Sequence, residues 1–164
     1  MPRKQGSRGA ILRAMSQNMP EANAIEAVVG WLDAMRRGDF GAVAEWFDPK
    51  VIWRGIPDEA VCRDREDVLE MLRDSFTPCP DDPKRHELEP GLRGAEAVEL
   101  LAPDAETVVL GAKVPGLSEV GDVALGGQLY NVFRVRRGRI VEVVDHARRD
   151  EAITAAGAQA PAWR

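Results

Sequence analysis

The sequence predicts an α+β fold, in which a curved antiparallel sheet forms a cone wrapped around N-terminal helices. Two observations predict it. Up to residue 76, apolar residues recur mainly at helical spacing, whereas from residue 97 onward they gather in short runs rich in Val, Leu and Ile. A sheet with helices on one face buries its apolar side by curling around them. We expect such a cone to leave a cavity of the kind that binds small molecules.

Three helices are expected before residue 77. The first follows Glu21 and ends at Gly38, because its apolar residues share one face and glycine favours the end of a helix. Asp39 is placed to cap a short second helix. Asp64 is placed to cap the third. The apolar faces of these helices are expected to consist of Ile25, Val28, Val29, Leu32, Met35, Val43, Trp46, Phe47, Val68, Leu69, Leu72 and Phe76.

Strands are expected wherever β-branched residues gather between turn residues. The first strand covers residues 51–53 and is stopped by Gly55 and Pro57. Arg137 and Gly138 mark a tight hairpin between the last two strands. Asp150 is expected to cap a closing helix. The four later strands are predicted at residues 97–101, 107–114, 128–135 and 140–145.

Composition narrows the class of protein. The chain has 164 residues, which predicts one domain, and 45% hydrophobic with 30% charged residues is typical of a globular protein. A formal charge of −5 argues against binding to nucleic acid, which needs a basic surface. No apolar run is long enough to cross a membrane. Cys62 and Cys79 read as reduced thiols, which predicts a cytoplasmic protein.

The two ends are expected to lie outside the domain. Residues 1–20 are basic and predict a disordered tail, with contact to nucleic acid or membrane as the alternative. The domain is expected at residues 21–157, followed by a tail at 158–164. Alanine and glycine richness, together with arginine in place of lysine, is associated with a bacterial source.

Three segments carry a resemblance to a known family. They are A-M-R-R-G-D-F-G-A-V-A-E-W-F at 34–47, D-P-K-V-I-W at 48–53 and V-F-R-V-R-R-G-R-I-V-E at 132–142. In this order they resemble the nuclear transport factor 2-like superfamily, and within it the SnoaL-like group, over nearly all of residues 24–156. The resemblance implies a cone-shaped α+β barrel and a homodimer. It does not choose an activity, because the superfamily contains isomerases, epoxide hydrolases, cyclases, dehydratases and non-catalytic binders.

The resemblance allows a comparison with ketosteroid isomerases. It places Trp31 where they have a catalytic tyrosine, Gly55 where they have a base and Asn131 where they have a protonated aspartate. Glycine cannot abstract a proton, so this reaction is not supported. Trp31 and Asn131 still carry N–H groups that can donate hydrogen bonds to a ligand oxygen.

A second comparison is with limonene-type epoxide hydrolases. Their tyrosine, asparagine and arginine fall on Trp53, Gly55 and Lys113, and one of their aspartates falls on Pro115. Only the aspartate of the last strand remains, as Asp145. The fold is therefore expected to be shared and the hydrolytic set to be lost.

A third comparison makes Asp145 the candidate acid or base. Arg134 must face water, and alternation along the strands then turns Asn131, Phe133 and Asp145 inward. SnoaL-type cyclases use one carboxylate in a largely apolar cavity, and a partly buried carboxylate has a raised pKa that suits proton transfer. Lys113 would lower that pKa, or stabilise an enolate, if it reaches Asp145. The alternative is a structural ion pair between Asp145 and Lys113, Arg148 or Arg149.

The remaining candidates concern ligand contact and assembly. Tyr130 and Gln128 are expected on the outer sheet face, where they suit a homodimer interface. His146 reads as a proton shuttle or as a residue of the rim. His86 and His146 lie far apart without paired cysteines, so neither a metal nor a cofactor is expected. Residues expected to bind a mostly apolar, oxygen-bearing small molecule are Trp31, Trp53, Asn131, Phe133 and His146.

Two functions follow from these residues. The first is a cofactor-free proton-transfer enzyme of cyclase, isomerase or dehydratase type, which uses Asp145 with Lys113 as a possible partner. The second is a non-catalytic ligand-binding or assembly module, because neither known catalytic set is complete.

Overall fold

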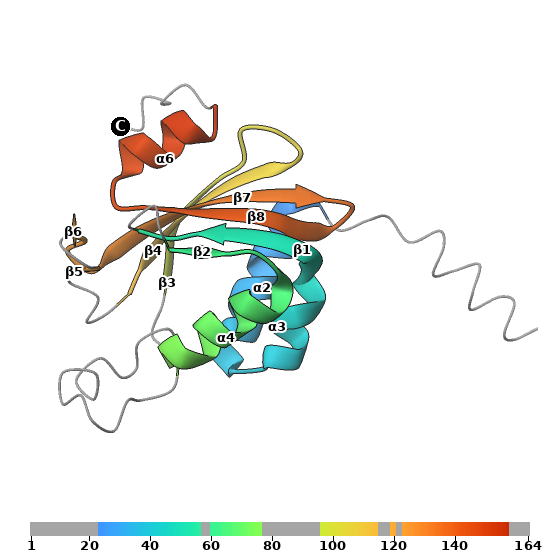
Figure 1. Cartoon of the computed structure of the whole chain (residues 1–164). Helices are drawn as coiled ribbons and strands as arrows, with labels where there is room; N and C mark the ends of the chain where they lie inside the picture. Colours follow the sequence, from blue (N-terminus) through green and yellow to red (C-terminus); the bar gives the residue numbers. More distant parts are fainter. Residues whose placement is uncertain (1–22, 57–59, 77–95, 115–118, 121–122, 158–164) are drawn as a thin grey trace, which may run out of the picture.

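The computed structural model describes residues 23–56, 60–76, 96–114, 119–120 and 123–157. The expected tails at 1–20 and 158–164 lie outside these residues, as do Cys79, His86 and Pro115. Within them the chain forms the expected α+β arrangement of helices against a curved, open sheet (Figure 1).

The three early helices begin after residues whose side chains cap the first turn, and the first of them ends at a glycine. Helix α2 covers Ala24–Arg37, starting after an Asn23 cap rather than at Glu21, and ends on Gly38 in the left-handed conformation. Helix α3 covers Phe40–Trp46, and its cap Asp39 accepts a hydrogen bond from the Ala42 amide, as predicted. Helix α4 covers Arg65–Phe76, and the carboxylate of Asp64 accepts from the backbone of Asp67 at 2.9 Å.

One sheet of six strands carries the fold, in the order β2-β1-β8-β7-β4-β3. A separate pair, β5 (Glu119–Val120) and β6 (Val123–Ala124), was not predicted. Neither was β2, the short edge strand beside β1. The strands of the large sheet are β1 (Phe47–Arg54), β2 (Val61–Cys62), β3 (Glu96–Leu101), β4 (Thr107–Lys113), β7 (Gln128–Arg136) and β8 (Arg139–His146).

One strand pairing departs from the expected antiparallel order. Strand β1 runs parallel to β8, with Trp53 opposite Val143, whereas every other pair in the sheet is antiparallel. Parallel neighbours need a long connection between them, and here the chain from β1 to β8 includes α4 and most of the sheet. The hairpin between β7 and β8 is as predicted, since Arg137 and Gly138 both have positive φ, at 52° and 74°.

Each face of the sheet is covered by different helices. Helices α2, α3 and α4 pack on the inner face, whereas α6 (Arg149–Ala155) lies on the other side (Figure 1). The cap of α6 is Arg148, which makes no side-chain hydrogen bond to the helix, and the predicted cap Asp150 lies in its first turn. The outer cluster under α6 consists of Val109, Val132, Ala152 and Ala156, with Leu101 and Tyr130 packed against it.

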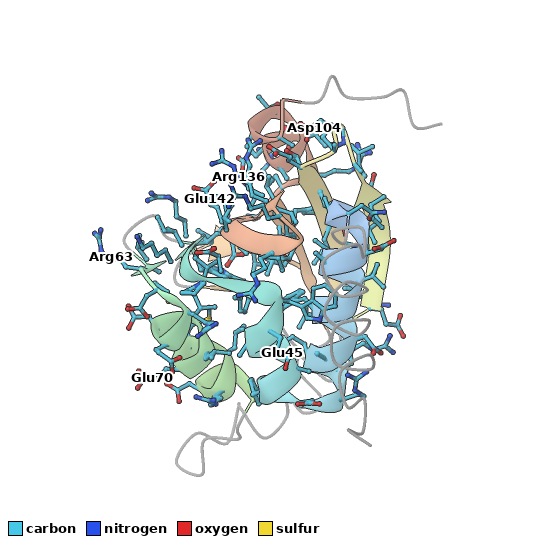
Figure 2. The ribbon with its side chains drawn as sticks, turned by 90° about the vertical axis from the view of Figure 1, so that its right-hand side faces the viewer. Glu45, Arg63, Glu70, Asp104, Arg136 and Glu142 are labelled. Carbon is cyan, nitrogen blue, oxygen red and sulfur yellow. The ribbon has the colours of Figure 1, made fainter. Side chains whose placement is uncertain are left out.

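Strand alternation sets which side chains face the helices. Asn131 and Phe133 are buried on the inner face of β7, as predicted. Figure 2 shows Arg136 and Glu142 on the side of the sheet away from α2 and α4. The inner face of the β7–β8 pair is therefore available to Asp145 and its neighbours.

Helix α2 approaches α3 closely at a glycine. A Cβ atom added at Gly30 would lie 2.3 Å from Cζ2 of Trp46, which is closer than any real contact. Gly30 thus lets the Trp46 ring pack against the backbone of α2. This contact holds together α2 and α3, two of the helices that cover the inner face of the sheet.

Candidate functional site

Asp145 and two N–H donors form the candidate site at the inner face of the sheet. The amide Nδ2 of Asn131 donates to Oδ1 of Asp145 at 2.6 Å. The indole Nε1 of Trp53 donates to Oδ2 at 3.0 Å. Each carboxylate oxygen therefore accepts one hydrogen bond from a different neighbouring strand.

The register of three strands brings these residues together. Asn131 lies directly opposite Asp145 across β7 and β8, and Trp53 lies beside Val143, two residues before Asp145. A Cβ atom at Gly55 would be 3.9 Å from Oδ2 of Asp145, so the backbone of Gly55 passes close to the carboxylate. Strand alternation predicted the inward direction of Asp145, and the two hydrogen bonds agree with it.

Burial is the largest influence on the pKa of Asp145. Loss of solvent contact raises its pKa from 3.8 to about 6, although the hydrogen bonds from Trp53 and Asn131 favour the charged form and lower the pKa. The carboxylate thus changes protonation near neutral pH. Groups of this kind gather at functional sites, because proton transfer needs a pKa near the working pH.

Four aromatic rings pack beside this carboxylate. Trp31 of α2 lies 5.2 Å from Phe133, 5.9 Å from Trp53 and 6.5 Å from Phe47, measured between ring centroids. Phe47 and Trp53 are 6.4 Å apart in an edge-on arrangement. Tilted and edge-on rings at these distances attract one another. We call Trp31, Phe47, Trp53 and Phe133 the aromatic cluster.

One donor in the aromatic cluster has no acceptor. Nε1 of Trp31 is buried, and no described residue accepts a hydrogen bond from it. The indole N–H of Trp53 and one N–H of the Asn131 amide donate to Asp145. Asn131 is thus a partner of the carboxylate through one of the two N–H groups of its amide.

The structure does not bring Lys113 to Asp145. Lys113 is exposed and pairs with Gln128 in the register of β4 and β7, on the face opposite to Asn131 and Asp145. The two arginines considered as partners are also occupied elsewhere. Arg149 makes a bidentate ion pair with Glu99, and Arg148 lies near Asp150. Among the described residues, Asp145 therefore interacts with neutral N–H donors and not with a cation.

His146 and Tyr130 lie on the outer face. They are opposite each other in the β7–β8 register, one position along from the Asn131–Asp145 pair. The hydroxyl of Tyr130 donates to the side-chain oxygen of Gln128 at 3.1 Å. His146 is consequently separated from Asp145 by the sheet, although the two residues are adjacent in the chain.

Sequence reasoning did not place Cys62 near the site. Cys62 lies on β2 directly opposite Trp53 and packs against the inner core. Burial raises the pKa of its thiol, and the negative charges of Asp67, Asp145 and Asp64 raise it further. In the sequence, the only indication of this position is that Cys62 follows the turn residues Gly55 and Pro57, after which a second strand of a hairpin can form. A thiol in this environment stays protonated and is not a nucleophile.

Two further features of the described residues concern metal binding and membrane crossing. No group of three or more His, Cys, Asp or Glu side chains gathers there as a metal ligand set. Within the same part of the chain, no helix has the length and apolar character needed to cross a bilayer.

Comparison with known proteins identifies the fold. No protein-family model matches the chain, and no curated relative does. Many solved structures match its shape. A candidate polyketide cyclase from Sinorhizobium meliloti has a TM-score of 0.54 and 19% identity, covering 80% of this chain and 98% of that one.

Two more of the similar structures come from other bacteria. A SnoaL-like protein of unknown function from Burkholderia thailandensis has a TM-score of 0.54 and 16% identity, covering 75% of this chain and 92% of that one. An LEH-like epoxide hydrolase of M. tuberculosis has a TM-score of 0.52 and 17% identity, covering 81% and 88%. The fold is therefore that of the NTF2-like proteins, as the sequence resemblance implied. At these identities the likeness concerns the fold alone.

Proposed function

We propose that this protein binds a small, mostly apolar, oxygen-bearing molecule and moves a proton on it with Asp145, without a cofactor. The observation that carries the proposal is the inward Asp145 carboxylate, which is held at both oxygens and whose burial raises its pKa to about 6. The similar structures include proteins called a candidate polyketide cyclase and an epoxide hydrolase. Proton transfer to or from a carbonyl compound is the chemistry that one carboxylate can support alone.

The chemistry needs only one exchangeable proton. At neutral pH Asp145 is mainly charged and takes a proton from a carbon next to a carbonyl group, which leaves an enolate. The carboxylic acid formed on Asp145 then returns the proton to a different carbon of the same molecule, which gives an isomer. In a ring closure the enolate carbon first bonds to the carbon of a second carbonyl group in the molecule, the π bond of that carbonyl breaks, and Asp145 protonates the alkoxide oxygen that results. Trp53 and Asn131 keep the carboxylate in one orientation throughout, because each oxygen has a further lone pair beside the one they use.

Exchange of carbon-bound hydrogen with deuterium oxide tests this proposal without a known substrate. The protein is incubated with a panel of cyclic ketones and 1,3-diketones, and loss of the proton signal is followed by NMR. We expect at least one compound to exchange faster with protein than without it. Asp145→Asn should slow that exchange roughly 100-fold or more, which is typical of removing a general base.

A neighbouring carboxylate provides the matched control. Glu142→Gln makes the same change of carboxylate to amide on the same strand, at a position on the face of the sheet away from α2 and α4. It should leave the exchange rate unchanged. Equal rates for the wild type and Asp145→Asn with every accelerated compound would exclude Asp145 as the base.

A non-catalytic binding or assembly module is the second candidate. The observation that favours it is the aromatic cluster, whose rings pack on one another beside Asp145. This candidate expects no acceleration of exchange with any compound of the panel, together with a dimer in sedimentation at micromolar concentration. A homodimer and a cytoplasmic location belong to both candidates and rest on the sequence expectations alone.

A further inference from the structure

The side chain of Asn131 has one hydrogen-bond partner in the described part of the chain. Its Nδ2 donates to Oδ1 of Asp145 at 2.6 Å, and no other hydrogen bond to a described residue holds either end of the amide. Asn131 is buried, with 4% of its surface exposed. Among the described residues, Asp145 is therefore the hydrogen-bond partner that sets the orientation of this amide.

The two donors on Asp145 differ in what they can offer once the acid gains a proton. The indole of Trp53 carries an N–H donor and no acceptor, so it suits the charged carboxylate alone. A primary amide has a donor end and an acceptor end of nearly the same shape. Half a turn about the Cβ–Cγ bond of Asn131 would place its oxygen where the nitrogen now lies. The 2.6 Å separation also suits that second bond, since O–H···O distances run from roughly 2.5 to 3.0 Å.

We propose that Asn131 reverses its hydrogen bond when Asp145 of the ligand-free protein takes a proton from solvent. The amide N–H donates to the charged carboxylate, and after rotation the amide oxygen accepts the O–H of the neutral acid. The proton then lies on Oδ1 of Asp145, and no other bond is made or broken. This inference rests on the proposed function and describes regulation of the same site. Asn131 is thereby a positioning residue, which acts through Asp145.

Without this rotation, a protonated Asp145 would oppose one donor to another. A proton on Oδ1 would meet the N–H of Asn131, and a proton on Oδ2 in the direction of Trp53 would meet the indole N–H. A buried hydroxyl that finds no acceptor is costly. Rotation of Asn131 removes the conflict at Oδ1 and leaves the Trp53 bond at Oδ2 in place.

The titratable groups around this pair do not replace Asn131 as an acceptor. Cys62 of β2 is within electrostatic reach, since burial and nearby carboxylates, Asp145 among them, raise the pKa of its thiol, but sulfur is a weak acceptor. His146 lies on the outer face of the sheet. Charged side chains on the inner helices are exposed or half-exposed: Glu26, Asp33, Arg36 and Arg37 of α2, Glu45 of α3, and Arg65, Glu66, Asp67, Glu70, Arg73 and Asp74 of α4.

The reversal gives the site two resting forms. At high pH both donors hold a carboxylate that is ready to act as a base. At low pH the acid proton lies between Oδ1 of Asp145 and the Asn131 oxygen, where it is withheld from a ligand. During turnover Asn131 continues to donate, because the proton then arrives on a lone pair that the amide does not use. The amide thus separates a stored proton from one in use.

The small number of asparagines makes the orientation of Asn131 measurable. The chain has three, Asn18, Asn23 and Asn131, so protein made by cell-free synthesis with ¹⁵N-asparagine and ¹³C-aspartate gives three side-chain amide signals. The Asn131 signal is assigned by its loss in Asn131→Leu. If that variant does not fold, the signal is assigned by its coupling to the Asp145 carboxyl carbon, which Asp145→Asn abolishes.

Coupling across the hydrogen bond distinguishes the two orientations. It joins ¹⁵Nδ2 of Asn131 to ¹³Cγ of Asp145 only while the amide nitrogen donates to the carboxyl group. We expect this coupling at pH 8 and a loss of roughly tenfold or more at pH 4.5, because the pKa of Asp145 is about 6. Its midpoint should coincide with the titration of the Asp145 carboxyl carbon.

Asn23 is the matched control within the same sample. Its side-chain oxygen accepts from the backbone N–H of Glu26 at 2.9 Å, and its Nδ2 donates to Oε1 of Glu26 at 3.3 Å. The backbone bond fixes this amide at both pH values, so the nuclear Overhauser contacts of its two N–H protons should not change. Those of Asn131 should exchange places with pH in the wild type and stay constant in Asp145→Asn.

Two results would overturn the inference. One is a coupling that persists at pH 4.5, because the amide then donates to the neutral acid as well. The other is the absence of coupling in folded protein at pH 8. Deuterium exchange of the ketone panel separates this inference from the proposed function. Reversal without catalysed exchange would support the inference and reject the base, whereas catalysed exchange with persistent coupling would do the opposite.

Discussion

Asn131 and Asp145 face each other across strands β7 and β8, and their side chains join in a 2.6 Å hydrogen bond. Trp53 approaches the same carboxylate from β1, on the other side of β8. Two neutral donors from two strands thus orient one buried acid. Because neither donor carries a charge, burial outweighs them and the pKa of Asp145 stays above its ordinary value.

The raised pKa of Asp145 makes stability depend on pH. The folded-state pKa of about 6 exceeds the ordinary value of 3.8, so the contribution of Asp145 is fully present below pH 3.8 and is lost as pH rises through 6. Asp145→Asn does not titrate. We expect the free energy of unfolding of the wild type, relative to this variant, to fall by up to about 3 kcal/mol between about pH 4 and pH 7. Urea denaturation at several pH values measures the difference, and a constant difference would contradict it.

Trp53→Phe should raise the pKa of Asp145 further. The change removes the N–H that favours the charged carboxylate and keeps an aromatic ring in the cluster. The pKa is measured from the ¹³C shift of the Asp145 carboxyl group. Trp46→Phe is the matched control, since the Trp46 ring packs on Gly30 of α2, and it should leave the pKa in place. A lower or unchanged pKa in Trp53→Phe would count against the hydrogen bond.

Gly30→Ala should destabilise the protein although alanine favours helices. The new Cβ would lie 2.3 Å from Cζ2 of Trp46, and forcing these atoms apart costs about 1–3 kcal/mol. Gly41→Ala is the control in α3, where the nearest atom to the new Cβ is 3.5 Å away, and it should be neutral or stabilising. Thermal unfolding of the two variants compares them. Equal melting temperatures would show that α2 and α3 are not in close contact.

Glu99→Gln should loosen helix α6. Glu99 on β3 accepts two short hydrogen bonds from Arg149, at 2.8 Å and 2.6 Å, and this pairing lowers the pKa of the Glu99 carboxyl. The pairing therefore stabilises above pH 4.5 and its effect is lost as pH falls. We expect a loss of about 1 kcal/mol and faster amide exchange in α6. Glu96→Gln, at the exposed start of the same strand, should leave α6 exchange unchanged; equal exchange in both variants would contradict the prediction.

Alternation along single strands predicted half of the site. It turned Asn131, Phe133 and Asp145 inward, because β7 has a polar outer face with Arg134 and Arg136 at one end. On β4 polar and apolar residues do not alternate, so the same reasoning could not be applied there. Six of its seven residues are buried, since α2 covers one face and α6 the other, so Lys113 could not be assigned to a face from the pattern.

Pairings between distant segments account for what the sequence did not predict. Trp53 and Asp145 are 92 residues apart, and no local pattern indicates that β1 lies parallel to β8. Cys62 reaches the inner face only because a second short strand follows the turn after Gly55. That Trp31 Nε1 finds no acceptor among the described residues is also a property of packing, since it depends on which rings surround the indole.

The parallel pairing of β1 with β8 has a consequence for synthesis of the chain. Strand β1 is made early, yet its partner begins at Arg139, so β1 and β2 wait for almost the whole domain to emerge before they join the sheet. Contacts this distant along the chain slow folding, since a long loop must close first. The Trp53–Asp145 hydrogen bond therefore cannot form until the chain has been made as far as Asp145, and a nascent chain that stops before Arg139 lacks both β8 and the carboxylate that Trp53 and Asn131 hold.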